Sequence, residues 1–130
     1  MQAQLASHTI FNTVPTHDYL GLLNEDGSSK KVVDFLKFTK EDVAKATGLP
    51  KASIRYDERI PAELIQRLQE IGIICELVAD YFKGDLRKTA LWFQIKNPAL
   101  GNISPRDMIR YGRYQKLVKF VQNALEGNAP

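Results

Sequence analysis

The stretch of sequence that decides the fold is residues 61–82, PAELIQRLQEIGIICELVADYF. Its apolar residues alternate at spacings of four and three, the period of one face of an α-helix; they are Leu64, Leu68, Ile71, Cys75, Val78 and Phe82. Pro61 suits the first position of a helix, where its missing N–H costs little. We therefore predict one long helix over these residues. Its apolar stripe fits an intramolecular core, and it would also serve a coiled-coil seam or a dimer.

On the C-terminal side, the sequence predicts shorter helices joined by tight connections. Gly84-Asp85 ends the long helix and caps a helix over residues 86–95. Asn97-Pro98 stops that helix, because a residue before proline avoids the helical region. Ser104-Pro105 is typical of the cap and first position of a short helix, and a last helix is predicted over residues 114–125. The predicted fold class is therefore all-α.

On the N-terminal side, residues 29–60 have the anatomy of a helix-turn-helix. Thr39 and Asp42 form a capping-box pattern, Gly48 fits the turn, and a second short helix is predicted from Lys51 to about Tyr56. In a DNA-binding protein this second helix would enter the major groove, so its candidate DNA-contacting residues are Lys51, Ser53, Arg55 and Tyr56. Residues 39–59 carry five basic and four acidic residues, a weak footprint for phosphate binding. The element could equally serve only to pack a small helical domain.

The bulk composition is that of a small globular chain with one basic half. The 130 residues are 44% hydrophobic and 25% charged, which excludes a disordered chain, and no apolar stretch approaches the ~20 residues that span a bilayer. The single cysteine, Cys75, excludes an internal disulfide and is compatible with a cytoplasmic location. The net charge of +3 is uneven, because residues 81–130 carry nine basic against three acidic residues.

That basic half predicts a surface for an anionic partner. Its arginines and lysines follow one another at nearly helical spacing, namely Arg106, Arg110, Arg113, Lys116 and Lys119. Such a stripe suits an acidic protein surface or DNA phosphates, and it also suits a solvated face. Trp92 is open to two interpretations as well, a core packing residue or an exposed anchor.

We expect no enzymatic activity, metal site or cofactor. The two histidines, His8 and His17, lie in no recognisable catalytic or metal-ligand pattern, and the sequence has no glycine-rich phosphate loop. Residues 1–28 are expected to form a flexible polar leader, in which residues 9–14 could form a short strand.

The most specific motif lies in the basic half. The run Asn97-Pro98-Ala99-Leu100-Gly101 follows Trp92-Phe93 and precedes Ser104-Pro105-Arg106-Asp107. Residues 81–130 thereby resemble the toxin-binding domain of the Xre/MbcA/ParS family of antitoxins, and the helix-turn-helix ahead of them matches the family's domain order. The resemblance covers about residues 30–130. It implies a helix-turn-helix domain over 29–60, a connecting helix over 61–82 and a toxin-binding domain over 83–130.

This resemblance implies a type II antitoxin that binds and neutralises a RES-domain toxin, an NAD-consuming enzyme. In the family, the complex commonly binds its own promoter through the helix-turn-helix. Carried onto this chain, the family motif gives architectural roles to Trp92, Asn97, Pro98, Leu100, Gly101, Ser104 and Pro105. The toxin-binding surface would come from the last helix and tail, comprising Arg110, Arg113, Lys116, Glu126, Asn128, Ala129 and Pro130.

Two functions are therefore expected from the sequence. The first is this antitoxin, forming a homodimer or a higher hetero-complex with its cognate toxin, with operator DNA as a second partner and no role for a membrane. The alternative is a stand-alone helix-turn-helix transcriptional regulator that acts through Lys51, Ser53 and Arg55.

Overall fold

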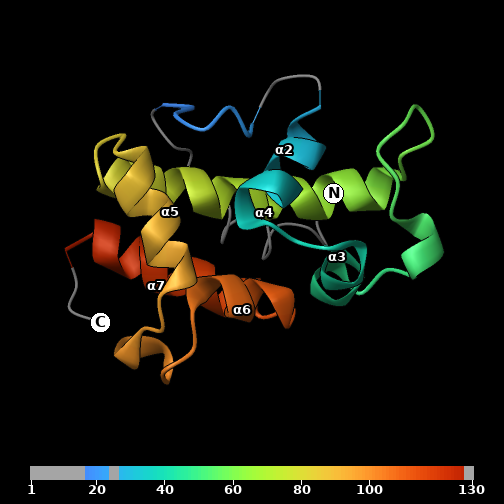
Figure 1. Ribbon diagram of the computed structural model, residues 1–130. Helices are drawn as coiled ribbons and strands as arrows, with labels where there is room; N and C mark the ends of the chain where they lie inside the picture. The colour runs from blue at the N-terminus through green and yellow to red at the C-terminus, as the bar shows by residue number, and fades with distance from the viewer. Residues whose placement is uncertain (1–16, 24–26, 128–130) are drawn as a thin grey trace, which may run out of the picture.

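The computed structural model of the protein describes residues 17–23 and 27–127, and their regular secondary structure is helical (Figure 1). In chain order the helices are α2 (Ser28–Leu36), α3 (Lys40–Thr47), η2 (Lys51–Ser53), α4 (Ala62–Tyr81), α5 (Leu86–Gln94), η3 (Pro98–Leu100), α6 (Pro105–Arg110) and α7 (Tyr114–Leu125). Within these ranges β-structure is limited to an isolated antiparallel bridge between Asn97 and Ile103. The predicted all-α fold class is confirmed. A search of the described helices finds none with the length and apolar character needed to cross a membrane.

Helix α4 crosses the middle of the molecule, and the other helices pack around it (Figure 1). Five of the six stripe residues, Leu64 to Val78, are buried and Phe82 is partly buried, so the stripe faces an intramolecular core. Burial extends beyond the stripe to Ile74 and Leu77, because α2 and α7 both pack along α4. The helix begins at Ala62, with Pro61 at the N-cap, one residue later than predicted.

The predicted helix-turn-helix region and the predicted toxin-binding region share one hydrophobic core. Val32 of α2 and Val43 of α3 belong to the same buried cluster as Phe93, Ile109 and Leu117 from the C-terminal helices. Helix α3 contacts α6 as well as α4, so the two regions also meet directly. Since burial of apolar area drives folding, the two regions stabilise each other.

The segment before α2 is part of this core. Leu22 is only 2% exposed, and the carboxylate of Glu76 in α4 accepts hydrogen bonds from the Leu20 amide (3.0 Å) and the Leu22 amide (3.1 Å). Gly72 of α4 makes room for this segment, because a Cβ there would lie 3.2 Å from the Leu22 carbonyl oxygen. The expectation of a leader outside the folded domain is therefore wrong for residues 18–22. The strand considered for residues 9–14 lies outside the described residues.

The second element of the expected helix-turn-helix is shorter than predicted. It is the single 3₁₀ turn η2, and Ile54 after it has an extended backbone. Ile54 does point into the core as predicted. It has no apolar partner three or four residues later, where Asp57 and Glu58 stand, so no amphipathic face sustains a longer helix. The first element agrees with prediction, because Thr39 and Asp42 form a reciprocal capping box at the start of α3.

Candidate partner-binding surface

The connection between α5 and α6 is built from the residues of the sequence motif. The side chain of Asn97 accepts from the Ala99 amide (2.9 Å), which starts the turn η3, and Pro98 occupies a first-turn position of η3. Gly101 ends the turn with a φ of 82°, a value that favours glycine. The Asn97 amide then donates to the Ile103 carbonyl (3.1 Å), closing the loop. Asn97, Pro98 and Gly101 therefore each have a role in setting the backbone conformation of this turn.

The same connection positions α6. Ser104 is buried, and its hydroxyl accepts from the Asp107 amide (3.1 Å) at the helix start, while Pro105 occupies a first-turn position of α6. The predicted cap is therefore present. The Asp107 carboxylate contacts Arg110 (3.1 Å). Leu100 is half-buried against the core, as an architectural residue would be.

Trp92 combines features of a core packing residue and of an exposed anchor. Its ring packs edge-on against Phe93 and is partly buried, yet it also lines an open groove of about 380 Å³. The groove lies between the end of α4, helix α5 and helix α7; its other lining residues are Val78, Tyr81, Phe82, Asn97, Phe120, Val121, Ala124 and Gly127. The lining is mainly apolar and aromatic, as is typical of a surface that accepts apolar groups.

The predicted basic stripe is not one continuous helical face. Helix α6 ends at Arg110 and α7 begins at Tyr114, with Gly112 (φ 79°) between them. Arg106 turns back to the end of α2, where its guanidinium donates to the Leu36 carbonyl (2.5 Å) and the Lys37 carbonyl (2.8 Å). Arg106 therefore ties α6 to α2 by satisfying helix-end carbonyls.

Arg110 is also engaged within the protein. Its guanidinium contacts the carboxylates of Asp107 (3.1 Å) and Asp42 (4.0 Å) and donates to the Tyr111 hydroxyl (2.9 Å). The Asp107 hydrogen bond, ahead of smaller contributions, raises the pKa of Arg110, so the side chain stays charged. A partner that binds Arg110 would have to compete with these contacts.

The remaining predicted toxin-binding residues lie along and beyond α7. Arg113 and Lys116 are exposed one turn apart, and neither forms an ion pair within the described part of the chain. Glu126 is exposed at the end of α7. Asn128, Ala129 and Pro130 lie outside the described residues. The structure thus brings Arg113 and Lys116 together and separates them from Arg106.

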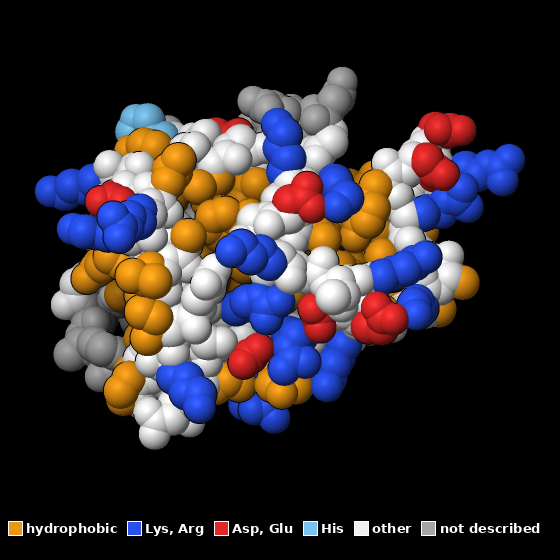
Figure 2. All heavy atoms as spheres, in the orientation of Figure 1, with side chains coloured by type: hydrophobic (Ala, Val, Ile, Leu, Met, Phe, Trp, Pro, Cys, Tyr) orange, Lys and Arg blue, Asp and Glu red, His pale blue; other side chains and the backbone are white. Residues whose placement is uncertain are grey.

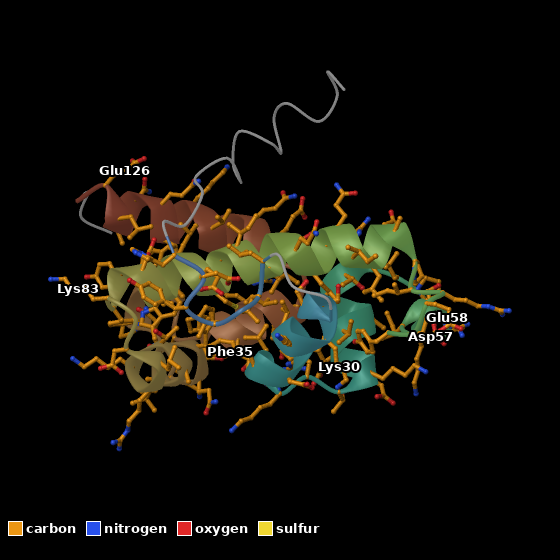
Figure 3. The ribbon with its side chains drawn as sticks, turned by 90° about the horizontal axis from the view of Figure 1, so that it is seen from above. Lys30, Phe35, Asp57, Glu58, Lys83 and Glu126 are labelled. Atoms are coloured by element: carbon orange, nitrogen blue, oxygen red, sulfur yellow. The ribbon has the colours of Figure 1, made fainter. Side chains whose placement is uncertain are left out.

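The four predicted DNA-contacting residues form no common cationic surface. Lys51 is paired with Glu41 (2.6 Å), and Arg55 is paired with Asp57 through two hydrogen bonds. Tyr56 turns its hydroxyl inward, where it is buried without a hydrogen-bond partner in the described structure, and burial raises its pKa. Ser53 is half-buried. Figure 3 shows the acidic side chains of Asp57 and Glu58 at the tip of this end of the molecule.

Sequence reasoning missed an exposed apolar surface on α5. Leu91 and Ile95 are each 53% exposed, Leu86 is 50% exposed, and Tyr81 at the end of α4 is 55% exposed. Figure 2 shows hydrophobic side chains over α5, beside a group of Lys and Arg side chains. The signal in the sequence was an apolar residue on every side of this helix, more than one core-facing stripe requires.

Comparison of the chain with protein-family models, with curated proteins and with solved structures finds no match.

Proposed function

We propose that this protein is the antitoxin of a type II toxin–antitoxin system, which binds and neutralises a RES-type, NAD-consuming toxin. The observation that carries the proposal is the connection from Asn97 to Pro105. Its motif residues are the ones by which the sequence resembles the Xre/MbcA/ParS antitoxins, and each has a specific backbone task in the folded chain. These structural tasks agree with the architectural roles that the resemblance implies for Asn97, Pro98, Gly101 and Ser104.

The surface chemistry of the C-terminal half supports a protein partner. The residues from Tyr81 onward combine exposed apolar side chains with a strong excess of positive charge. Protein interfaces combine an apolar centre with a polar rim, whereas nucleic-acid interfaces are mainly polar and cationic. An apolar surface on a basic domain therefore favours a protein with acidic surface groups as the partner.

Co-expression with the adjacent gene tests the proposal. If that gene encodes the toxin, its expression alone should arrest growth, and co-expression of this chain should restore growth and yield a stable complex. Growth arrest that persists with the wild-type chain, together with no co-purification, would refute the antitoxin assignment.

Promoter binding, as part of the antitoxin function or as the stand-alone regulator, has weaker support. Contact through Lys51 and Arg55 requires DNA phosphates to replace Glu41 and Asp57, although such exposed ion pairs contribute little to stability. A salt titration of binding to the upstream DNA tests it. DNA binding should weaken steeply with salt and fall several-fold in Arg55→Ala. If neither the protein nor its toxin complex binds this DNA detectably, η2 has no role in DNA recognition and serves only to pack the fold.

A further inference from the structure

Helix α5 presents an apolar surface that the core does not use. Leu91 and Ile95 are one turn apart and more than half exposed. Ile95 is the C-cap of α5 and has an extended backbone, so Leu91, Trp92 and Ile95 all lie toward the C-terminal end of this helix. Trp92 also lines the groove between α4, α5 and α7. The exposed side chains of Leu91 and Ile95 and the groove lined by Trp92 lie toward the same end of α5, and together we call them the α5 surface.

A rim of positive charge surrounds the α5 surface. Lys83, Arg87, Lys88 and Lys96 are all exposed, and within the described residues none of the four has an ion-pair partner. Figure 3 shows Lys83 pointing away from the body of the molecule. The nearby carboxylate of Asp85 is occupied at the start of α5, where it accepts from the Lys88 amide (3.0 Å). The four rim cations thus outnumber this one nearby carboxylate, and the rim is cationic overall.

This charge distribution decides which occupant fits. A second copy bound through a two-fold axis would place the same cationic rims against each other, and like charges across an interface are repulsive. An acidic segment would instead pair with the rim while its apolar side chains cover Leu91, Ile95 and the groove. Such a pairing also accelerates association by electrostatic steering.

We propose that the α5 surface is the docking site for an amphipathic segment of the toxin, with apolar side chains flanked by carboxylates. The proposal rests on the proposed antitoxin function and moves the centre of the toxin-binding surface from α7 to α5. The apolar side chains would contribute affinity, because desolvated apolar anchors dominate interface energetics. The cationic rim would raise the rate of association and favour acidic partners over basic ones.

The test measures binding of the adjacent gene product to full-length variants. Leu91→Ser/Ile95→Ser should raise the dissociation constant about 10- to 100-fold. The variant should remain folded, since both side chains are already half exposed. Arg87→Glu/Lys88→Glu should slow association about 10-fold and remove most of its salt dependence. The matched charge control is Lys40→Glu/Arg59→Glu, two exposed residues of the N-terminal half, which should bind like the wild type.

The outcomes separate this inference from the antitoxin proposal. If the wild type binds the adjacent gene product and both α5 variants bind it as tightly as the wild type does, the α5 inference is wrong while the antitoxin proposal stands. The α5 inference is also wrong if Arg113→Glu/Lys116→Glu on α7 abolishes binding while the α5 variants still bind. It is wrong as well if the wild type is a dimer and Leu91→Ser/Ile95→Ser makes it a monomer, because a second copy would then occupy the α5 surface. If the wild type itself does not bind the adjacent gene product, the antitoxin proposal fails, and the α5 inference fails with it.

Discussion

Glu76→Leu tests how the segment before α2 is held to the core. Glu76 is fully buried, and its carboxylate accepts from the amides of Leu20 and Leu22. The Leu22 amide keeps an acceptor, because it also donates to the Asp18 carboxylate (2.9 Å). The substitution therefore leaves the Leu20 amide without an acceptor, at a cost of about 1–3 kcal/mol. The segment can instead detach, which hydrates the amides but exposes Leu22 at about 1.5–3 kcal/mol. We expect the cheaper route, and therefore a loss of about 1–3 kcal/mol in the free energy of unfolding.

Glu76→Gln is the matched control. Its amide oxygen can accept from both Leu20 and Leu22, and its NH₂ can donate to Asp18, the neighbour with which Glu76 is hydrogen-bonded. Urea denaturation should place this variant within about 1 kcal/mol of the wild type at about pH 4, where Glu76 is protonated in the folded protein. Hydrogen exchange should show fast Leu20 and Leu22 amides in the leucine variant only. Equal stability of all three proteins, with slow exchange of both amides, would refute this account of the segment.

The same carboxyl gives the protein a pH dependence. Burial, reinforced by Asp18, raises the pKa of Glu76 from 4.5 to about 8 in the folded protein. Between these values the folded chain holds a proton that the unfolded chain has released, so stability falls as pH rises from about 4.5 to 8. The pKa of Asp18 is lowered below 3.8 by its hydrogen bond to Glu76, so its opposite effect falls at lower pH. Glu76→Gln should remove this fall in the free energy of unfolding between about pH 4.5 and 8, measured by urea denaturation at several pH values. The upper limit of the fall in the wild type is about 5 kcal/mol.

Three further substitutions test the core, the helix start and the arginine contact. Ile109→Ala should cost about 2–5 kcal/mol in urea denaturation, because this side chain is fully buried; a loss below 1 kcal/mol would show a poorly packed core. Thr39→Ala should cost about 1 kcal/mol by removing half of the capping box with Asp42, and Thr39→Ser should restore it. Arg106→Lys should lose the paired bonds to the end of α2 and cost about 1–3 kcal/mol, and wild-type stability of this variant would contradict the assigned role.

The sequence predicted those parts of the fold that depend on local chemistry. The sequence alone predicts the α4 stripe, the capping residues Thr39 and Asp85, and the end of α5 before Asn97-Pro98, because each depends on periodicity or on one residue's backbone preference. Glu76 could have been suspected, because it interrupts the apolar run from Ile73 to Ala79. Its acceptor role depends on a segment more than fifty residues away, which periodicity does not report.

The candidate site was harder to predict for the same physical reason. Regular spacing placed Arg106 on a stripe with Arg113, but a break between α6 and α7 sends Arg106 to the end of α2. Leu91 and Ile95 fall within the helix predicted over residues 86–95, and the packing of α5 leaves both of them exposed. Which face of a short helix remains exposed is decided by tertiary packing rather than by the helix's own pattern.

The most direct test of the central claim is the NAD-consuming activity of the adjacent gene product as this protein is titrated in. The antitoxin account predicts that NAD loss stops when the protein reaches a fixed stoichiometric ratio, and that Leu91→Ser/Ile95→Ser needs a large excess to reach the same inhibition. Undiminished NAD consumption at saturating wild-type protein would contradict the account.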